Sequence, residues 1–89
     1  MTTREFLESL GHPACAYCLV VQATQRDHVV AKSLRRRHHI DANDARFHVP
    51  SCGPCNWRKL THKLYPLGFD TSILPGKGWR KWDGGRIAA

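Results

Sequence analysis

Two Cys-x-x-Cys pairs constrain this chain more than any other feature of its sequence. Cys15 and Cys18 form the first pair, Cys52 and Cys55 form the second, and residues 19–51, 33 residues in all, lie between them. A chain of 89 residues builds only a small apolar core, which a metal or disulfides commonly supplement. Four thiolates in two such turns match the closed tetrahedral geometry of structural zinc. The spacing therefore predicts a structural Zn²⁺ site that joins two distant segments.

The alternative for these cysteines is a pair of disulfides or four free buried thiols. Residues 1–12 mix acidic and polar side chains and contain no long apolar stretch, so the sequence shows no secretory signal. Disulfides persist mainly in oxidising compartments, whereas paired Cys-x-x-Cys turns in a chain without an export signal favour metal ligation. We therefore expect zinc rather than disulfides, and a cytoplasmic location.

The charge of the chain indicates a polyanionic partner. Lys and Arg number 14 against 7 Asp and Glu, which gives a formal net charge of +7. No window approaches 18 consecutive apolar residues, so no membrane partner is expected. Nucleic acid is the partner that such a charge favours. Charge by itself identifies no enzyme, because ribosomal-type proteins share it.

Local patterns predict an α+β domain with helices at two places. The first helix is expected over residues 5–10 with Thr3 as its cap, and Gly11 and Pro13 end it. The second is expected over residues 56–64, because Trp57, Leu60 and Leu64 recur at the spacing of one helical face. The tryptophans are expected to be packing residues.

Between these helices the patterns predict a hairpin and a loop. Residues 19–22 and 27–30 are β-prone and are expected to pair antiparallel. The basic, polar stretch 32–43 is expected to be a long loop. Residues 67–89 are rich in Gly and Trp and are expected to form an irregular tail held by Trp79 and Trp82.

The motifs CAYC, RDHVV and CGPCNWRK, in that order, resemble the HNH (ββα-metal) endonucleases over residues 15–59. The resemblance implies a β-hairpin and one helix stapled by zinc, which would follow the N-terminal helix that the local pattern predicts. It implies an HNH nuclease domain over residues 1–66, with residues 67–89 as an extension of the same domain. The implied activity is metal-dependent hydrolysis of DNA phosphodiester bonds, with nicking or low sequence specificity.

In this resemblance, Asp27, His28 and Asn56 form the active site. His28 takes the place of the general base, and a neutral imidazole suits that role because its ordinary pKa is about 6.5. Asp27 and Asn56 take the place of ligands for a catalytic Mg²⁺ or Mn²⁺, which prefers oxygen donors. Adjacent strand residues point to opposite faces, so Asp27 and His28 share one site only if the strand ends or bends there.

The sequence departs from the family pattern at its middle asparagine. Phe47 occupies that position, and the asparagine of the family braces the loop before the second strand. Asn43 or His48 could take over this role, and the sequence does not distinguish them. Asn56 also has a competing interpretation as a helix cap.

A basic surface beside the site is the candidate DNA contact. A solvated loop is the alternative for its first part, and phosphate contacts of this kind carry weak sequence preference. A homodimer or a larger phage or repair complex is the expected context for double-strand breaks, in the host cytoplasm if the chain is phage-encoded. The rival hypothesis is a non-catalytic, zinc-stapled nucleic-acid-binding module. The candidate contacts are Arg35, Arg36, Arg37, His38, His39, Arg58, Lys59 and Lys63.

Overall fold

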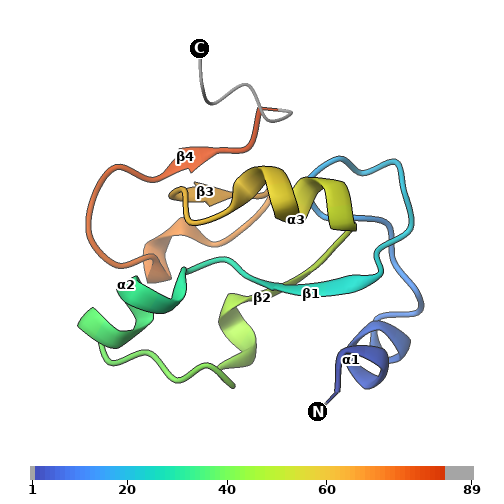
Figure 1. Cartoon of the computed structure of the whole chain (residues 1–89), viewed down its shortest axis with the longest axis horizontal. Helices are drawn as coiled ribbons and strands as arrows, with labels where there is room; N and C mark the ends of the chain where they lie inside the picture. The colour runs from blue at the N-terminus through green and yellow to red at the C-terminus, as the bar shows by residue number, and fades with distance from the viewer. Residues whose placement is uncertain (1, 84–89) are drawn as a thin grey trace.

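The computed structural model of the chain describes residues 2–83 and has the expected α+β composition (Figure 1). No helix within these residues is long and apolar enough to cross a membrane. Two small sheets, β1–β2 and β3–β4, lie on either side of α3 along the chain. The elements are α1 (Thr3–Ser9), β1 (Gln25–His28), α2 (Lys32–Arg37), η1 (Ala45–Phe47), β2 (His48–Ser51), α3 (Gly53–Lys59), β3 (Leu64–Tyr65), η2 (Thr71–Ile73) and β4 (Arg80–Lys81).

Helix α1 begins at a capping box. The Thr2 hydroxyl accepts a hydrogen bond from the backbone N–H of Glu5, and the Glu5 carboxylate accepts one from the backbone N–H of Thr2. The predicted cap at Thr3 is therefore wrong by one residue, because the reciprocal pairing needs Thr and Glu three positions apart. Phe6 is the buried residue of α1, and its ring meets that of His48 edge to face at 6.2 Å.

The predicted pairing of residues 27–30 with residues 19–22 is wrong. Strand β1 pairs antiparallel with β2, and the register sets Asp27 opposite Val49 and His28 opposite His48. Residues 19–22 instead form the turn after the first Cys-x-x-Cys pair, where Leu19 has a φ of 62° and Val20 is 82% exposed. Apolar composition predicted a strand there, but the geometry of the cysteine turn overrides it.

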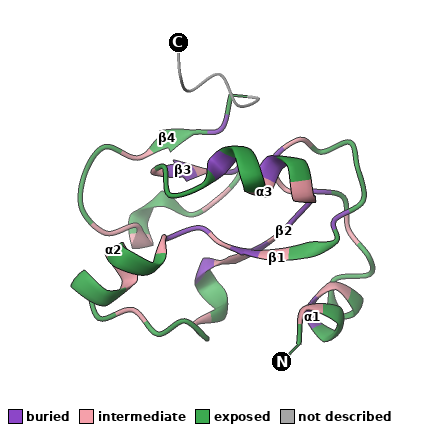
Figure 2. Ribbon diagram, in the orientation of Figure 1, coloured by how far each residue is buried: buried purple, intermediate pink, exposed green. Residues whose placement is uncertain are grey.

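A helix interrupts the predicted loop 32–43. Residues of α2 are good helix formers, since Lys, Leu and Arg lose little rotamer freedom in a helix. None of them is buried, and Figure 2 shows α2 as exposed or half-buried along its length. The basic run was expected to be irregular because it lacks an apolar face, yet it forms a short surface helix.

Helix α3 starts and ends earlier than predicted. Pro54 lies within its first turn, and Leu60, with a φ of 47°, ends the helix. Trp57 is 74% exposed, so the prediction that it packs in the core is wrong. Leu64 is buried from β3, outside the helix. The apparent helical spacing therefore combined residues from two elements.

The tail is mostly irregular but contributes to the core. Strand β4 pairs parallel with β3, which the sequence did not indicate. Trp82 is buried and packs edge to face on Tyr17 at 5.2 Å, while Trp79 is half-buried. The tail thus covers the core as expected, and the predicted extension beyond position 83 lies outside the described residues. The main buried cluster comprises Cys15, Tyr17, Val29, Val49, Cys52, Cys55, Leu64 and Trp82.

Candidate functional site

The four cysteines meet in one cluster that could hold a structural metal such as zinc. Their sulfur atoms all lie within 4.8 Å of one another, and all four are free thiols. Thiolates at about 2.3 Å from a tetrahedral zinc lie about 3.8 Å apart, which agrees with this cluster. The first pair precedes β1 and the second opens α3, so the cluster joins the two segments as the spacing predicted.

The surroundings of the thiols favour a bound cation. Backbone N–H groups of Val21 and Val20 hydrogen-bond the Cys18 sulfur and lower its pKa to about 6. Burial raises the pKa of Cys55 above its ordinary value. A divalent metal compensates for this cost because it stabilises the thiolate form directly.

His28 lies at the end of β1 and is half-buried. Its Nε2 atom lies 3.0 Å from the carbonyl oxygen of Ala42. A carbonyl oxygen only accepts hydrogen bonds, so Nε2 carries the proton and Nδ1 of the neutral ring carries the free lone pair. Burial lowers the pKa of His28; the hydrogen bond to Ala42 partly offsets this effect, and nearby cationic groups, Arg35 first, lower the pKa further. The ring is therefore held in a neutral, base-competent form.

His48 braces the loop that supports His28. Its Nε2 lies 2.7 Å from the same Ala42 carbonyl oxygen, and the two rings meet edge to face at 4.7 Å. The backbone N–H of Asn43 donates to the Asp41 carboxylate at 2.8 Å. The side chain of His48 therefore holds the loop through the Ala42 carbonyl oxygen.

A small cavity lies beside this histidine pair. Its volume is about 170 Å³, and Phe6, Arg26, Asn43, Ala45 and His48 line it. Arginine and histidine side chains at the wall of a cavity suit an anionic group. A larger hollow of about 390 Å³ beside α1 is lined by none of the predicted site residues.

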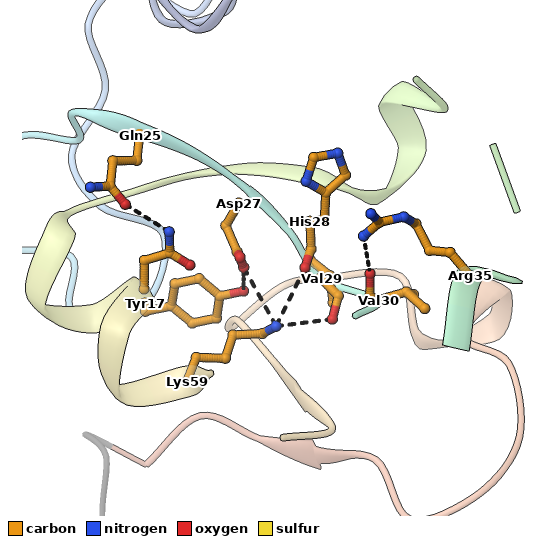
Figure 3. Close-up of polar contacts among 9 residues, drawn as sticks. Tyr17, Gln25, Asp27, His28, Val29, Val30, Arg35 and Lys59 are labelled. Carbon is orange, nitrogen blue, oxygen red and sulfur yellow. Dashed lines mark hydrogen bonds and ion pairs between the residues drawn. The ribbon is translucent and has the colours of Figure 1, made fainter. Parts of the chain in front are cut away.

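Asp27 lies on the face of β1 opposite to His28 (Figure 3). Its carboxylate is buried, accepts a hydrogen bond from the Tyr17 hydroxyl and lies 3.7 Å from the Lys59 ammonium. Burial raises the pKa of Asp27, and Lys59 partly offsets that rise. The bend that would bring Asp27 and His28 to one side is absent from β1.

Asn56 lies inside α3 rather than at its cap. Cys52 occupies the cap position and makes no side-chain cap hydrogen bond, so the interpretation of Asn56 as the cap is wrong. The Asn56 amide nitrogen instead donates to the Gln25 side-chain oxygen at 2.7 Å. This contact links α3 to the start of β1.

A catalytic divalent cation does not fit Asp27 and Asn56 in this arrangement. The Asp27 carboxylate already pairs with a buried ammonium, which would repel a second cation at the same oxygen. A hard cation such as Mg²⁺ also requires accessible oxygen ligands and several waters, whereas Asp27 is only 6% exposed. The carboxylate expected to bind the metal is therefore committed to contacts within the protein.

The predicted DNA contacts divide into outward and inward groups. The Lys59 prediction is wrong, because its side chain is only 1% exposed. Arg35 is half-buried and donates to the Val30 carbonyl oxygen at 2.7 Å. The Lys63 ammonium donates to the Lys77 carbonyl oxygen, also at 2.7 Å. The exposed members are Arg36, Arg37, His38, His39 and Arg58.

The positions of Lys59, Gln25 and Asp27 within their helix and strand could have indicated that these side chains point inward, although their polar character suggests exposure. Lys59 follows the buried Cys55 by four positions, which places both on one helical face. Gln25 and Asp27 are two positions apart in β1, so both side chains lie on the face toward α3. The structure thus brings together the four cysteines, and it brings His28 beside His48, but it does not bring Asp27 to the same side as His28.

Comparison of the chain with protein-family models, curated proteins and solved structures finds no match.

Proposed function

We propose that the protein is a small zinc-stapled DNA endonuclease in which His28 is the general base. The observation that carries this proposal is the hydrogen bond between His28 Nε2 and the Ala42 carbonyl oxygen. It assigns the proton to Nε2 and leaves the Nδ1 lone pair to take a proton from water. The lowered pKa of His28 keeps that nitrogen unprotonated near neutral pH.

The charge around His28 suits a phosphodiester substrate. Arg26 lines the adjacent cavity, and α2 places Arg36 and Arg37 on the surface. Cationic side chains attract the phosphate backbone and stabilise the charge that develops during hydrolysis. Phosphate contacts read no bases, so the expected activity is nicking with weak sequence preference.

The structural metal in this proposal is zinc, held by the four cysteines. It ties the segment before β1 to the start of α3 and so fixes the frame that presents His28. The resemblance also implies Mg²⁺ or Mn²⁺ for the reaction. The Asp27 carboxylate is buried and paired with Lys59, so no reaction step is assigned to such a cation.

Cleavage of supercoiled plasmid tests the proposal. The purified protein is assayed with Mg²⁺, with Mn²⁺ and with EDTA, beside His28→Ala and the control His62→Ala, whose residue is exposed. We expect nicking by the wild-type protein and by the control, and a loss of roughly 100-fold or more in His28→Ala. Equal rates in His28→Ala and the wild-type protein would show that His28 is not the base.

One observation favours the rival function, a nucleic-acid-binding module without catalysis. Asp27, which the resemblance assigns to the reaction, is engaged by Lys59 and Tyr17. A binding module would retain DNA affinity in His28→Ala and would cleave under none of the metal conditions. DNA binding measured on the same samples distinguishes the two functions.

A further inference from the structure

We infer that Lys59 is a positioning residue that, together with Arg35, fixes the backbone on which His28 is carried. The catalytic consequence of this inference rests on the proposed function, whereas its structural part does not. Cationic side chains from α2 and α3 hold the carbonyl oxygens of His28, the last residue of β1, and of Val29 and Val30 after it, as Figure 3 shows.

The Lys59 ammonium is fully engaged from within the protein. Its Nζ lies 3.0 Å from the Val29 carbonyl oxygen, 3.4 Å from that of His28 and 3.7 Å from Asp27 Oδ2. An ammonium group has three protons, and three acceptors surround it here. Lys59 therefore contacts the backbone of the proposed base directly, and it touches the side chain of the preceding residue.

Arg35, from α2, holds the third of these carbonyl oxygens. Its guanidinium donates to the Val30 carbonyl oxygen at 2.7 Å. Val29 and Val30 are both 0% exposed, so their carbonyl groups have little access to water and would be costly to leave without donors. The Val29 N–H donates to the Phe47 carbonyl oxygen at 2.9 Å, which fixes the other edge of this segment.

Burying the Lys59 ammonium carries a desolvation penalty that an apolar side chain would not. Burial lowers the pKa of Lys59, which reflects the cost of removing an ammonium from water. An apolar side chain would fill the same space without that cost, but it could not donate to the carbonyl oxygens of His28 and Val29. The hydrogen bonds to the backbone beside His28 are therefore the specific contribution of Lys59.

The test compares Lys59→Met, Lys59→Arg and the control Lys81→Met, which changes an exposed lysine of β4. Zinc content and circular dichroism establish folding. Long-range ¹H–¹⁵N spectra report which ring nitrogen of His28 carries the proton. In folded Lys59→Met we expect the Nε2–H form to lose its dominance, and kcat to fall by roughly 10- to 100-fold with KM changed by less than about 3-fold. Lys59→Arg should partly restore both readouts.

A folded Lys59→Met protein with the wild-type His28 spectrum would overturn the inference. If Lys59→Met does not fold, Arg35→Met is tested in its place, since it removes only the Val30 contact. A changed His28 spectrum in Arg35→Met supports the inference, and an unchanged spectrum overturns it. If the spectrum changes but even the wild-type protein cleaves no DNA, positioning is supported and the proposed function fails. The two failures are thus distinguishable.

Discussion

The imidazoles of His28 and His48 share one hydrogen-bond acceptor, the carbonyl oxygen of Ala42. The two Nε2 atoms lie 3.0 and 2.7 Å from this oxygen, and the ring centroids are 4.7 Å apart. Both Nε2 atoms therefore donate to one backbone group of the loop, and the Nδ1 atom of the neutral His28 ring is left as an acceptor. The loop, the end of β1 and the start of β2 are coupled at this point.

The stability of the protein should depend on pH through His28. Its pKa in the folded protein lies below the ordinary value of 6.5, so folding favours the neutral ring. The stabilisation is present above about pH 6.5 and is lost as the pH falls through the lower folded value. We expect the free energy of unfolding of His28→Ala to fall less steeply on acidification than that of the wild-type protein, as measured by urea denaturation. The control His62→Ala should retain the wild-type slope, and equal slopes in all three would contradict the prediction.

Removing zinc should unfold the chain. We expect purified protein to contain about one zinc per chain and a chelator to abolish its circular dichroism signal, because such a site supplies roughly 10 kcal/mol or more of binding energy coupled to folding. Cys55→Ser should fold poorly even with zinc present. A reducing agent alone is the control, and it should have no effect on the four free thiols. Loss of the fold on reduction without chelation would instead indicate disulfides.

The N-terminal cap predicts a difference between two adjacent threonines. Thr2→Ala should lower the free energy of unfolding by about 1 kcal/mol, because it removes the side-chain acceptor of the Glu5 N–H. Thr3→Ala is the matched control and should have no effect or a slightly stabilising one, since Ala is the better helix former. Thermal unfolding of both variants checks this, and an equal loss in the two would contradict the capping box.

The exposed arginines of α2 should contribute to DNA affinity by binding phosphates. The double variant Arg36→Ala/Arg37→Ala should bind a DNA duplex more weakly, and the slope of log affinity against log salt should become shallower by about 0.9 for each phosphate that the variant no longer neutralises. Its thermal stability should be unchanged, because both side chains are exposed. Arg35→Met is the contrast: its guanidinium holds the Val30 carbonyl oxygen, so stability should fall as well. Fluorescence anisotropy at several salt concentrations provides the measurement, and an unchanged slope in the double variant would exclude a role for these arginines in phosphate binding.

The existence of helix α1 and of the cysteine cluster was predictable from local determinants, although the cap of α1 was predicted one residue too late, at Thr3 instead of Thr2. A Thr and a Glu three positions apart define a capping box, and two Cys-x-x-Cys turns bring thiols to one ion whatever lies between them. The partner of β1 was not predictable in the same way. Residues 19–22 are β-prone in composition and yet form the turn after Cys18, whereas residues 48–51, which include Pro50, pair with β1.

The sequence by itself determined the cysteine cluster and the basic charge, and it indicated a histidine in a strand, whereas the structure placed His28 at the end of β1. Tertiary structure alone decided what Asp27 and Lys59 do. They lie 32 positions apart (27 to 59), and their pairing depends on which face of β1 meets which face of α3. Ligand type and spacing act over a few residues, whereas the role of a charged side chain depends on its burial, which the packing of the whole chain sets.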